Sequence, residues 1–421
     1  MKNLMILGAG NCQLNAIKRI RELGFRAVVS DNRLDSPGKR MADVSVLADT
    51  FSYEQTYKSA VTEAVDGIMT SGTDQPVLTV NKVASTLGLP QLLDVETALW
   101  VTDKSHMKRL FTKHGIPTAP YALCKADFKD EALDHIEPPY VIKPVDSQGQ
   151  RGIYKVNSLE EIRSRLKDVL SYSRSDEILV ESYYENDEIT VTGWVERGAL
   201  HVLTVTDRVT FGSDSHIGVC LAHEYPSRQL NTHRDDIMAL TEKLCEVFHI
   251  ESGPIYFQYL VGAKGVLVNE IACRIGGAYE DIFVPLVTDV PLLDLTILSS
   301  VEPEGDRLNG LKEVFDHYVY SEKGARVSVQ LFFCKEGSVS ALTERSALLE
   351  LPYVVDMCYN IKVGEVIPSI ENASQRAGYA ILQAQDEDAL QACIEKFYET
   401  MQVLDDRGNN LVMKQKRIYR D

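Results

Sequence analysis

Short apolar runs and amphipathic segments alternate over the first hundred residues of the chain. Residues 4–7, 27–30 and 67–70 are apolar runs of strand length, and residues 15–23 and 75–87 have apolar positions at helical spacing. Strands that alternate with helices usually form a parallel sheet covered on both faces. The pattern therefore predicts an α/β domain with a doubly wound parallel sheet at the N-terminus.

The pattern changes after this region and indicates several further units. A helical segment at 104–113 precedes the sequence Gly-Ile-Pro-Thr-Ala-Pro at 115–120, whose prolines mark a linker or hinge. Strands mixed with a helix at 158–172 indicate a small α+β unit, and a long helix is expected at 235–248. The rest of the chain is rich in strand signals, with a helix at 388–401. The expected units of this mixed α/β and α+β chain are 1–100, 101–136 (a linker segment), 137–209, 210–324 and 325–421.

Residues 255–277 are two apolar runs separated by Gly-Ala-Lys-Gly. This pattern predicts a β-hairpin, which lays Gln258 on the first strand beside Glu270 on the second. An amide oxygen and a carboxylate at one sheet edge suit a hard cation such as Mg²⁺, which prefers oxygen ligands. Arg274 follows just beyond, and its planar guanidinium suits an anion. Taken alone, the segment is also that of an ordinary hairpin with a surface glutamate.

Another strand, at residues 140–143, ends in Lys143 and runs into a loop that contains Ser147, Gly149 and Gly152. Glycines let backbone N–H groups approach phosphate oxygens, and a lysine on the preceding strand can neutralise them. The loop is not a Walker A motif, because no Gly-Lys-Ser/Thr opens a helix. An ordinary glycine turn between two strands is the alternative interpretation.

Two carboxylates, Glu181 and Glu188, flank the next link between predicted strands. A carboxylate suits ribose hydroxyls, and the backbone of a short link suits the edge of an adenine ring. A solvated acidic turn is the simpler interpretation of the same residues.

The overall composition limits the classes of partner. The 421-residue chain has a formal net charge of −17, which argues against nucleic-acid binding. It has no run of 18 apolar residues, so no membrane span is expected, and its first residues lack the features of a signal peptide. The 8 cysteines are scattered without a CxxC pair, which favours a reducing cytoplasm over disulfides or structural zinc.

The order of these motifs along the chain resembles that of the ATP-grasp superfamily. The chain is most similar to its carboxylate–amine ligases, among them L-amino acid ligases, and to the ATP-grasp proteins of the carbamoyl-phosphate synthase and biotin carboxylase type. The resemblance runs from residue 1 to about residue 300 and continues more loosely through residues 364–379. It implies an N-terminal pre-ATP-grasp domain, a two-part ATP-grasp fold with a mobile lid, and a strand-rich C-terminal module.

The resemblance also implies an activity and a set of site residues. The activity would be ATP-dependent, ADP-forming ligation through an acyl phosphate, with ATP and Mg²⁺ (or Mn²⁺), a small carboxylate such as an amino acid, and an amine; a homodimer is compatible with it. The ATP-binding residues would be Lys104, Lys143, Ser147, Gly149, Gly152, Glu181 and Glu188. The metal ligands would be Gln258 and Glu270, and the catalytic residues Arg274 and Arg208. The substrate residues would be Asn11, Gln13, Gly276 and Gly277.

Two positions depart from the family pattern. The family often places an asparagine two residues after the metal-binding glutamate, where this chain has Ala272, and we expect Asn269 to face the opposite side of its strand. Gln258 stands where many relatives carry an acid. These departures keep open two alternatives, a bicarbonate- or carbamate-activating enzyme and a nucleotide-binding protein without turnover.

The N-terminal glycines resemble an NAD-binding fingerprint only in part. Gly8 and Gly10 follow the first predicted strand and Asp31 follows the second, but Gln13 occupies the position of the third glycine. Because open α/β sheets bind many ligands at the same edge, we expect this turn to contribute to a substrate pocket.

Overall fold

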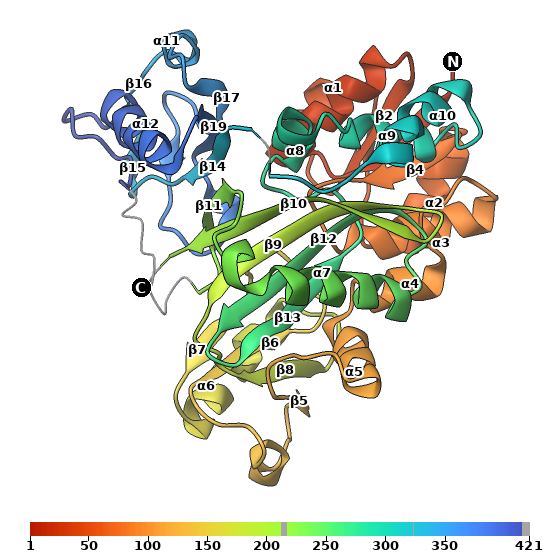
Figure 1. Cartoon of the computed structure of the whole chain (residues 1–421), viewed down its shortest axis with the longest axis vertical. Helices are drawn as coiled ribbons and strands as arrows, with labels where there is room; N and C mark the ends of the chain where they lie inside the picture. Colours follow the sequence, from red (N-terminus) through yellow and green to blue (C-terminus); the bar gives the residue numbers. More distant parts are fainter. Residues whose placement is uncertain (212–216, 323, 415–421) are drawn as a thin grey trace.

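The computed structural model describes residues 1–211, 217–322 and 324–414 of the chain (Figure 1). Its N-terminal unit is a four-stranded parallel sheet in the order β3-β2-β1-β4, which confirms the predicted fold class for this region. The strands are β1 (Asn3–Leu7), β2 (Arg26–Asp31), β3 (Val44–Leu47) and β4 (Gly67–Thr70), and the helices are α1 (Leu14–Glu22), α2 (Tyr53–Thr62) and α3 (Pro76–Leu87). Helix α3 begins with a proline and is followed by Gly88, which caps its C-terminal end in a left-handed conformation with a φ of 67°.

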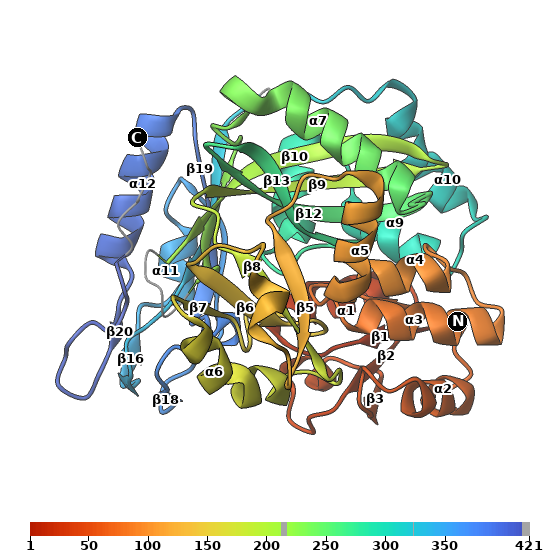
Figure 2. The same ribbon diagram turned by 90° about the horizontal axis from the view of Figure 1, so that it is seen from below.

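A second four-stranded sheet, which we call the small sheet, has the order β5-β8-β6-β7. Its strands are β5 (Tyr121–Lys125), β6 (Tyr140–Pro144), β7 (Tyr154–Val156) and β8 (Glu177–Ser182), and helix α6 (Leu159–Ser171) covers one face. The preceding helices α4 (Val95–Trp100) and α5 (Lys104–His114) lie between this sheet and the N-terminal unit (Figure 2). Asp103 caps α5 by accepting a hydrogen bond from the Ser105 N–H at 2.8 Å, which fixes where Lys104 enters the helix.

The largest sheet has eight strands in the order β13-β12-β9-β10-β11-β14-β19-β17. They are β9 (Asp187–Glu196), β10 (Ala199–Thr210), β11 (Cys220–Tyr225), β12 (Ser252–Gly262), β13 (Gly265–Ala272), β14 (Arg326–Phe332), β17 (Val354–Tyr359) and β19 (Gly378–Ala384). Neighbouring residues of β9 face opposite sides, so Trp194 packs with α8 (Glu280–Thr288) and α9 (Leu292–Ser299), whereas Val195 packs with α7 (Leu230–Val247).

The sheets divide the chain differently from the expected units. Strands β9 and β10 lie in the unit expected at 137–209, yet they pair in the large sheet, and β14, β17 and β19 extend that sheet into the unit expected at 325–421. The segment 101–136, which we expected to be a linker, contains strand β5 of the small sheet. Periodicity identifies a strand but not its partner, because pairing depends on contacts between residues far apart in sequence. Helix α7 also begins five residues before the expected position 235, with a non-helical kink at His233.

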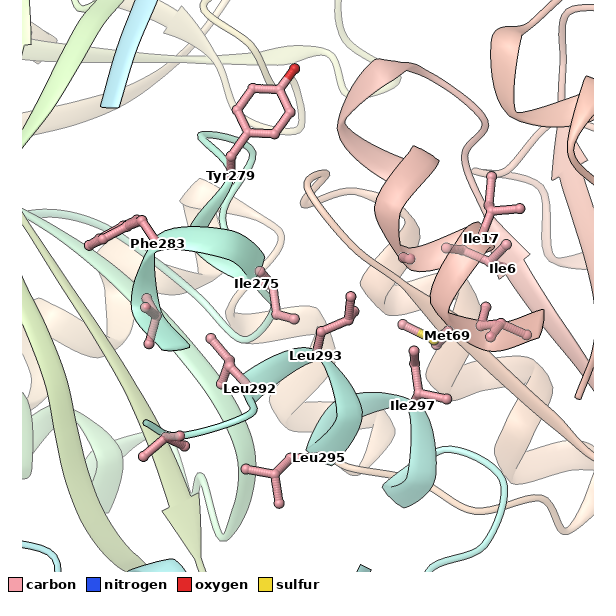
Figure 3. Packing of buried hydrophobic residues seen from close by; sticks show 14 of the residues in the cluster. Ile6, Ile17, Met69, Ile275, Tyr279, Phe283, Leu292, Leu293, Leu295 and Ile297 are labelled. Carbon is pink, nitrogen blue, oxygen red and sulfur yellow. The ribbon is translucent and has the colours of Figure 1, made fainter. Parts of the chain in front are cut away.

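One hydrophobic core joins the N-terminal unit to the large sheet. Figure 3 shows Leu293 and Ile297 of α9 beside Met69 of the N-terminal unit, and Ile17 belongs to the same buried cluster. The same cluster reaches Leu203 on β10, so the two units share buried surface. Burial of this surface holds the carboxyl edge of the parallel sheet against the segment that follows β13.

The remaining elements lie mainly in the C-terminal part of the chain. They are α10 (Asp306–Lys312), β15 (Gly337–Ser338), β16 (Ala341–Leu342), α11 (Arg345–Leu349), β18 (Val366–Ile367), α12 (Glu387–Thr400) and β20 (Val403–Leu404). Short 3₁₀ turns occur at Asn11–Gln13, Pro37–Arg40, Asp130–Leu133, Glu313–His317 and Ala373–Gln375. Among the described residues no single helix is long and apolar enough to cross a membrane, although α8 and α9 meet that test as a pair bent by 117°.

Candidate active site

A cavity of about 230 Å³ lies between the small sheet and the large sheet, and we call it the intersheet cavity. Six of the residues singled out in the sequence line it: Lys104, Lys143, Glu181, Glu188, Arg208 and Glu270. They come from α5, β6, β8, β9, β10 and β13, so the fold gathers residues that are up to 166 positions apart (270 − 104). The predicted hairpin is confirmed, since β12 and β13 pair from Tyr256–Ala272 to Gly262–Gly265.

Glu181 lies between two buried lysines. Its Oε1 is 2.6 Å from Lys108 Nζ, and its Oε2 contacts Lys143 Nζ. Burial alone would raise the pKa of the Glu181 carboxyl, but the charges of Lys108 and Lys143 outweigh burial and lower it to about 2. Lys108 was not among the predicted site residues, although it lies one turn after Lys104 on the same helix. The Glu181 side chain is thus engaged by both lysines, and the N–H groups of the two residues that follow it donate to the Pro120 and Pro139 carbonyls. Contact of this backbone with an adenine ring stays a prediction.

Lys104 connects the hairpin to the glycine loop. Its Nζ lies 2.9 Å from Glu270 Oε1 and donates a hydrogen bond to the Ser147 carbonyl at 2.9 Å. Burial would lower the pKa of Lys104, but the nearby carboxylates, with Glu270 the largest contributor, together outweigh burial and raise it. Burial would likewise raise the pKa of Glu270, and Lys104 is the first of the cations that lower it. Both groups are therefore charged, so the site places lysine ammonium groups directly beside carboxylates.

Two adjacent residues of the glycine loop, Gln148 and Gly149, contact the N-terminal unit and the C-terminal part of the chain. Gln148 Oε1 accepts hydrogen bonds from the backbone N–H groups of Asp74 and Gln75, at 2.8 and 3.0 Å. The Gly149 carbonyl accepts one from the Ala373 N–H at 3.3 Å. Gly149 and Gly152 both have a φ of 71°, a conformation that favours glycine.

The loop residues differ in whether they reach the intersheet cavity. Gln150 and Ile153 line it, whereas Ser147, Gly149 and Gly152 are not among its described lining residues. Ser147 Oγ instead donates to the Arg151 carbonyl at 2.9 Å. These three residues shape the loop in this structure, and their contact with a phosphate stays a prediction.

The predicted metal ligands lie opposite each other. Gln258 and Glu270 are register partners in β12 and β13, and Gln258 Oε1 is buried without a hydrogen-bond partner in the described part of the chain. A buried acceptor without a partner is costly unless a ligand or ion satisfies it. No group of three or more His, Cys, Asp or Glu residues that could hold a metal occurs in the described ranges. An amide oxygen and a carboxylate nevertheless fit the oxygen preference of Mg²⁺, whose remaining positions are usually filled by water and phosphate.

Our expectation for Asn269 is wrong. The register shifts between Gln258 and Tyr259, because Tyr259 lies opposite Val268, so Asn269 is an extra residue in a β-bulge. The bulge places Asn269 and Glu270 on the wall of the same cavity, and Asn269 Oδ1 accepts a hydrogen bond from Lys143 Nζ at 3.3 Å. A third side-chain oxygen is thus available where Ala272 offers none.

Arg208 and Glu188 form a buried pair across β10 and β9, where they are register partners. Arg208 also donates from Nη2 to the Gly218 carbonyl at 2.8 Å, while its buried Nε has no partner among the described residues. Burial would lower the pKa of Arg208, but Glu188 outweighs it and raises it. Glu188 is therefore held by Arg208 at the cavity wall.

Arg274 lies beyond the end of β13 and is held by the N-terminal unit. Its Nε donates to Asp74 Oδ1 at 2.7 Å, and its guanidinium lies 4.5 Å from the centroid of the Tyr256 ring. Asp74 was not predicted as a site residue, because it follows β4 in a different sheet and no local pattern connects it to Arg274. Arg274 lines a second cavity of about 40 Å³ rather than the intersheet cavity.

The predicted substrate residues meet where the parallel sheet ends. Gln13 Nε2 donates to the Ser71 carbonyl at 2.6 Å, and a Cβ on Gly277 would lie 2.8 Å from the Gly72 carbonyl oxygen. Asn11 begins the 3₁₀ turn that carries Gln13. Asp31, which a dinucleotide site would need for a ribose, instead accepts hydrogen bonds from the Ala9 N–H and from Ser36.

Comparisons with known proteins match two segments of the chain. Residues 136–281 match the ATP-grasp domain, and residues 329–403 match L-amino acid ligase C-terminal domain 2. The chain is 25% identical over 200 residues to formate-dependent phosphoribosylglycinamide formyltransferase from Herminiimonas arsenicoxydans, covering 43% of this chain and 45% of that protein. It is 24% identical over 265 residues to the N-terminal section of the carbamoyl phosphate synthase large chain from Methanopyrus kandleri, covering 59% and 44%. The chain spans less than half the length of these curated relatives.

The fold is also shared with solved structures. L-amino acid ligase from Bacillus licheniformis superposes with a TM-score of 0.79 at 15% identity, covering 96% of this chain and 99% of that one. At this identity the likeness establishes the architecture alone.

Proposed function

We propose that this chain, which carries an ATP-grasp domain and an L-amino acid ligase C-terminal domain 2, is an ATP-dependent, ADP-forming carboxylate–amine ligase. The observation that carries the proposal is the position of Glu270, which pairs with the buried Gln258 and lies on the wall of a cavity that Lys104 and Lys143 also line. Oxygen ligands next to two lysines suit a metal–triphosphate better than a neutral or cationic ligand. We propose an amino acid as the carboxylate substrate.

The metal would be held by Gln258 and Glu270, with Asn269 as a further oxygen donor from the bulge. The unpartnered Gln258 oxygen supports this assignment. When bound, Mg²⁺ would neutralise the charge on the terminal phosphates.

The protein residues would position the reactants and neutralise charge. Lys104 and Lys143 would bind phosphate oxygens, and the backbone after Glu181 would meet adenine. Glu188 would meet the ribose, with Arg208 holding it in place and donating to phosphate through its free Nε. Water would be excluded by the loop 147–152, which already contacts the N-terminal unit through Gln148.

The reaction needs two steps because a carboxylate repels nucleophiles and oxide leaves poorly. In the first step a carboxylate oxygen attacks the γ-phosphorus, the bond to the β-phosphate oxygen breaks, and ADP leaves. In the second step the amine nitrogen attacks the acyl carbon, inorganic phosphate leaves, and the nitrogen loses a proton. Arg274 would bind the carboxylate and the acyl phosphate, since its guanidinium is fixed by Asp74 and Tyr256.

A bicarbonate-activating enzyme is the second candidate. The similarity to a carbamoyl phosphate synthase section and the glutamine at position 258 favour it. It would use the same phosphate and metal residues, so the two candidates differ only in the carboxylate that stimulates ATP turnover.

A phosphate-release screen tests the proposal. The purified chain is incubated with ATP and Mg²⁺, with amino acids singly and in pairs, and with bicarbonate in a separate arm. We expect ADP and phosphate with at least one amino acid. Stimulation by bicarbonate alone would favour the second candidate, and the absence of turnover with every carboxylate would refute both.

A further inference from the structure

Glu280, at the start of α8, is a buried carboxylate with one unused oxygen. Glu280 is only 1% exposed. The Oε2 atom accepts a hydrogen bond from the Ala278 N–H at 2.8 Å, whereas the buried Oε1 has no partner within the described ranges. Burying a carboxylate oxygen without a donor is costly. A folded protein that keeps such an atom usually satisfies it with a ligand or with water.

The Glu280 carboxyl group lies close to the Arg274 site. A Cβ placed on Gly276 would lie 2.4 Å from Glu280 Oε1 and 2.5 Å from Tyr256 Cε2, so the carboxyl group occupies space that only a glycine leaves open. Arg274 lies over the same Tyr256 ring, at 4.5 Å from its centroid. A fixed cation and a fixed anion therefore flank one aromatic ring, just beyond the end of the strand that carries Glu270.

The neighbouring arginines do not satisfy the free oxygen. Arg274 donates to Asp74 and to the Ile275 carbonyl. Arg376, from the C-terminal part of the chain, donates to the Gly277 carbonyl at 3.0 Å. Burial raises the pKa of Glu280 by more than the two arginines lower it. A donor that also carries positive charge would therefore be the most favourable partner for this oxygen.

The segment around Glu280 is held rigidly. Tyr279 precedes it with a φ of 63° and stacks on Tyr379 of β19, with ring centroids 3.5 Å apart. Phe283, one turn later on α8, belongs to the buried core and points away from the N-terminal unit (Figure 3). The carboxylate position is thus set by contacts of the residues before and after it in the chain and is formed before any ligand binds.

From this geometry, and resting on the proposed ligase function, we propose that Glu280 binds the α-ammonium group of the amino acid whose carboxylate lies at Arg274. An α-amino acid carries its ammonium and carboxylate groups on one carbon, so a single molecule can reach both residues. Bicarbonate, formate and simple carboxylates have no cationic donor and would leave Glu280 unpaired. Sites built to hydrogen-bond a polar group reject analogues that lack it far more strongly than apolar sites reject a missing methylene.

The test compares amino acids with their deaminated analogues. Each standard L-amino acid and the carboxylate that lacks its α-amino group are supplied with ATP, Mg²⁺ and hydroxylamine, which traps an acyl phosphate as a hydroxamate. We expect wild-type kcat/KM for hydroxamate formation to be at least about a hundredfold higher for the amino acid than for its analogue. The variant Glu280→Gln should lose at least about tenfold of that preference, while Glu313→Gln, at an exposed position, should keep it.

Nucleotide binding distinguishes a failure of the Glu280 assignment from a failure of the ligase proposal. Glu280 is not among the described residues that line the intersheet cavity, so ADP affinity measured by calorimetry should stay within about twofold in Glu280→Gln. If Glu280→Gln does not fold, as judged by its melting temperature, Glu280→Asp and the wild-type comparison provide the same test. Equal activation of amino acids and analogues, or an unchanged preference in the variant, would overturn the Glu280 assignment and leave the ligase proposal standing. Absence of phosphate release with every amino acid would overturn the ligase proposal and the Glu280 assignment with it, and release stimulated by bicarbonate alone would favour the bicarbonate-activating candidate instead.

Discussion

Removal of Lys108 should destabilise the small sheet through Glu181. Lys108 Nζ lies 2.6 Å from Glu181 Oε1, and the two side chains are 1% and 6% exposed. Removing one partner of a buried ion pair costs about 3–5 kcal/mol when the other charge is left alone. Because Lys143 still contacts the second oxygen of Glu181, we expect Lys108→Met to lower the free energy of opening the α5–β8 contact by about 2–3 kcal/mol. This corresponds to an increase of roughly 30- to 150-fold in the opening equilibrium of the α5–β8 contact.

Native-state hydrogen exchange of peptides covering α5 and β8 measures that opening directly. The control is Lys113→Met, an exposed lysine on the same helix, which should change the opening free energy by less than about 0.5 kcal/mol. A double-mutant cycle with Glu181→Gln isolates the coupling between the two residues. Equal protection in Lys108→Met and Lys113→Met would refute the argument that this pair stabilises the sheet.

The same pair has a defined pH dependence. The pKa of Glu181 is lowered from 4.5 to about 2, so the ionised carboxylate stabilises the folded chain above about pH 4.5, and this contribution is lost as the pH falls through about 2. The difference in the free energy of unfolding between wild type and Lys108→Met should therefore become smaller as the pH falls from about 4.5 to about 2. A difference that stays constant down to pH 2 would contradict the charge-based explanation.

Three further predictions concern the chemistry. Glu270→Gln should lower the rate of ATP turnover by about a hundredfold or more, because a metal ligand loses its charge. The control Glu251→Gln, at an exposed position, should keep the wild-type rate, and equal rates of phosphate release in the two variants would remove the metal assignment. Tryptic cleavage after Arg151 should slow when ATP and Mg²⁺ order the glycine loop, whereas cleavage after the exposed Arg197 serves as the internal control. Equal cleavage at Arg151 with and without nucleotide would count against the role of this loop as a lid. With a carboxylate labelled by ¹⁸O, the label should appear in inorganic phosphate, and its appearance in AMP would exclude attack at the γ-phosphorus.

The sequence by itself determined the features that depend on local pattern. The turn Gly262–Gly265 is only four residues long, so the sequence determined that β12 and β13 pair as a hairpin with Gln258 and Glu270 on adjoining strands. The exact pairing of Gln258 with Glu270 depends on the bulge, because the turn alone would place Gln258 opposite Asn269. The alternation of strands and helices likewise determined the parallel sheet of the N-terminal unit. The order of the lysine, glycine-loop and carboxylate motifs was sufficient for the ATP-grasp resemblance, which the match over residues 136–281 confirms.

Only the tertiary structure decided the features that depend on distant contacts. Lys108 and Asp74 became recognisable as site residues only because α5 lies against β8, and the end of β4 lies against the segment after β13. The bulge at Asn269 reversed the side predicted from strict alternation, since a one-residue insertion in a strand leaves no composition signal. The free oxygen of Glu280 is likewise invisible in sequence, because whether a carboxylate has a partner depends on the residues that the fold packs around it. Local periodicity fixes elements and short hairpins, whereas pairing, burial and hydrogen-bond satisfaction are properties of the assembled fold.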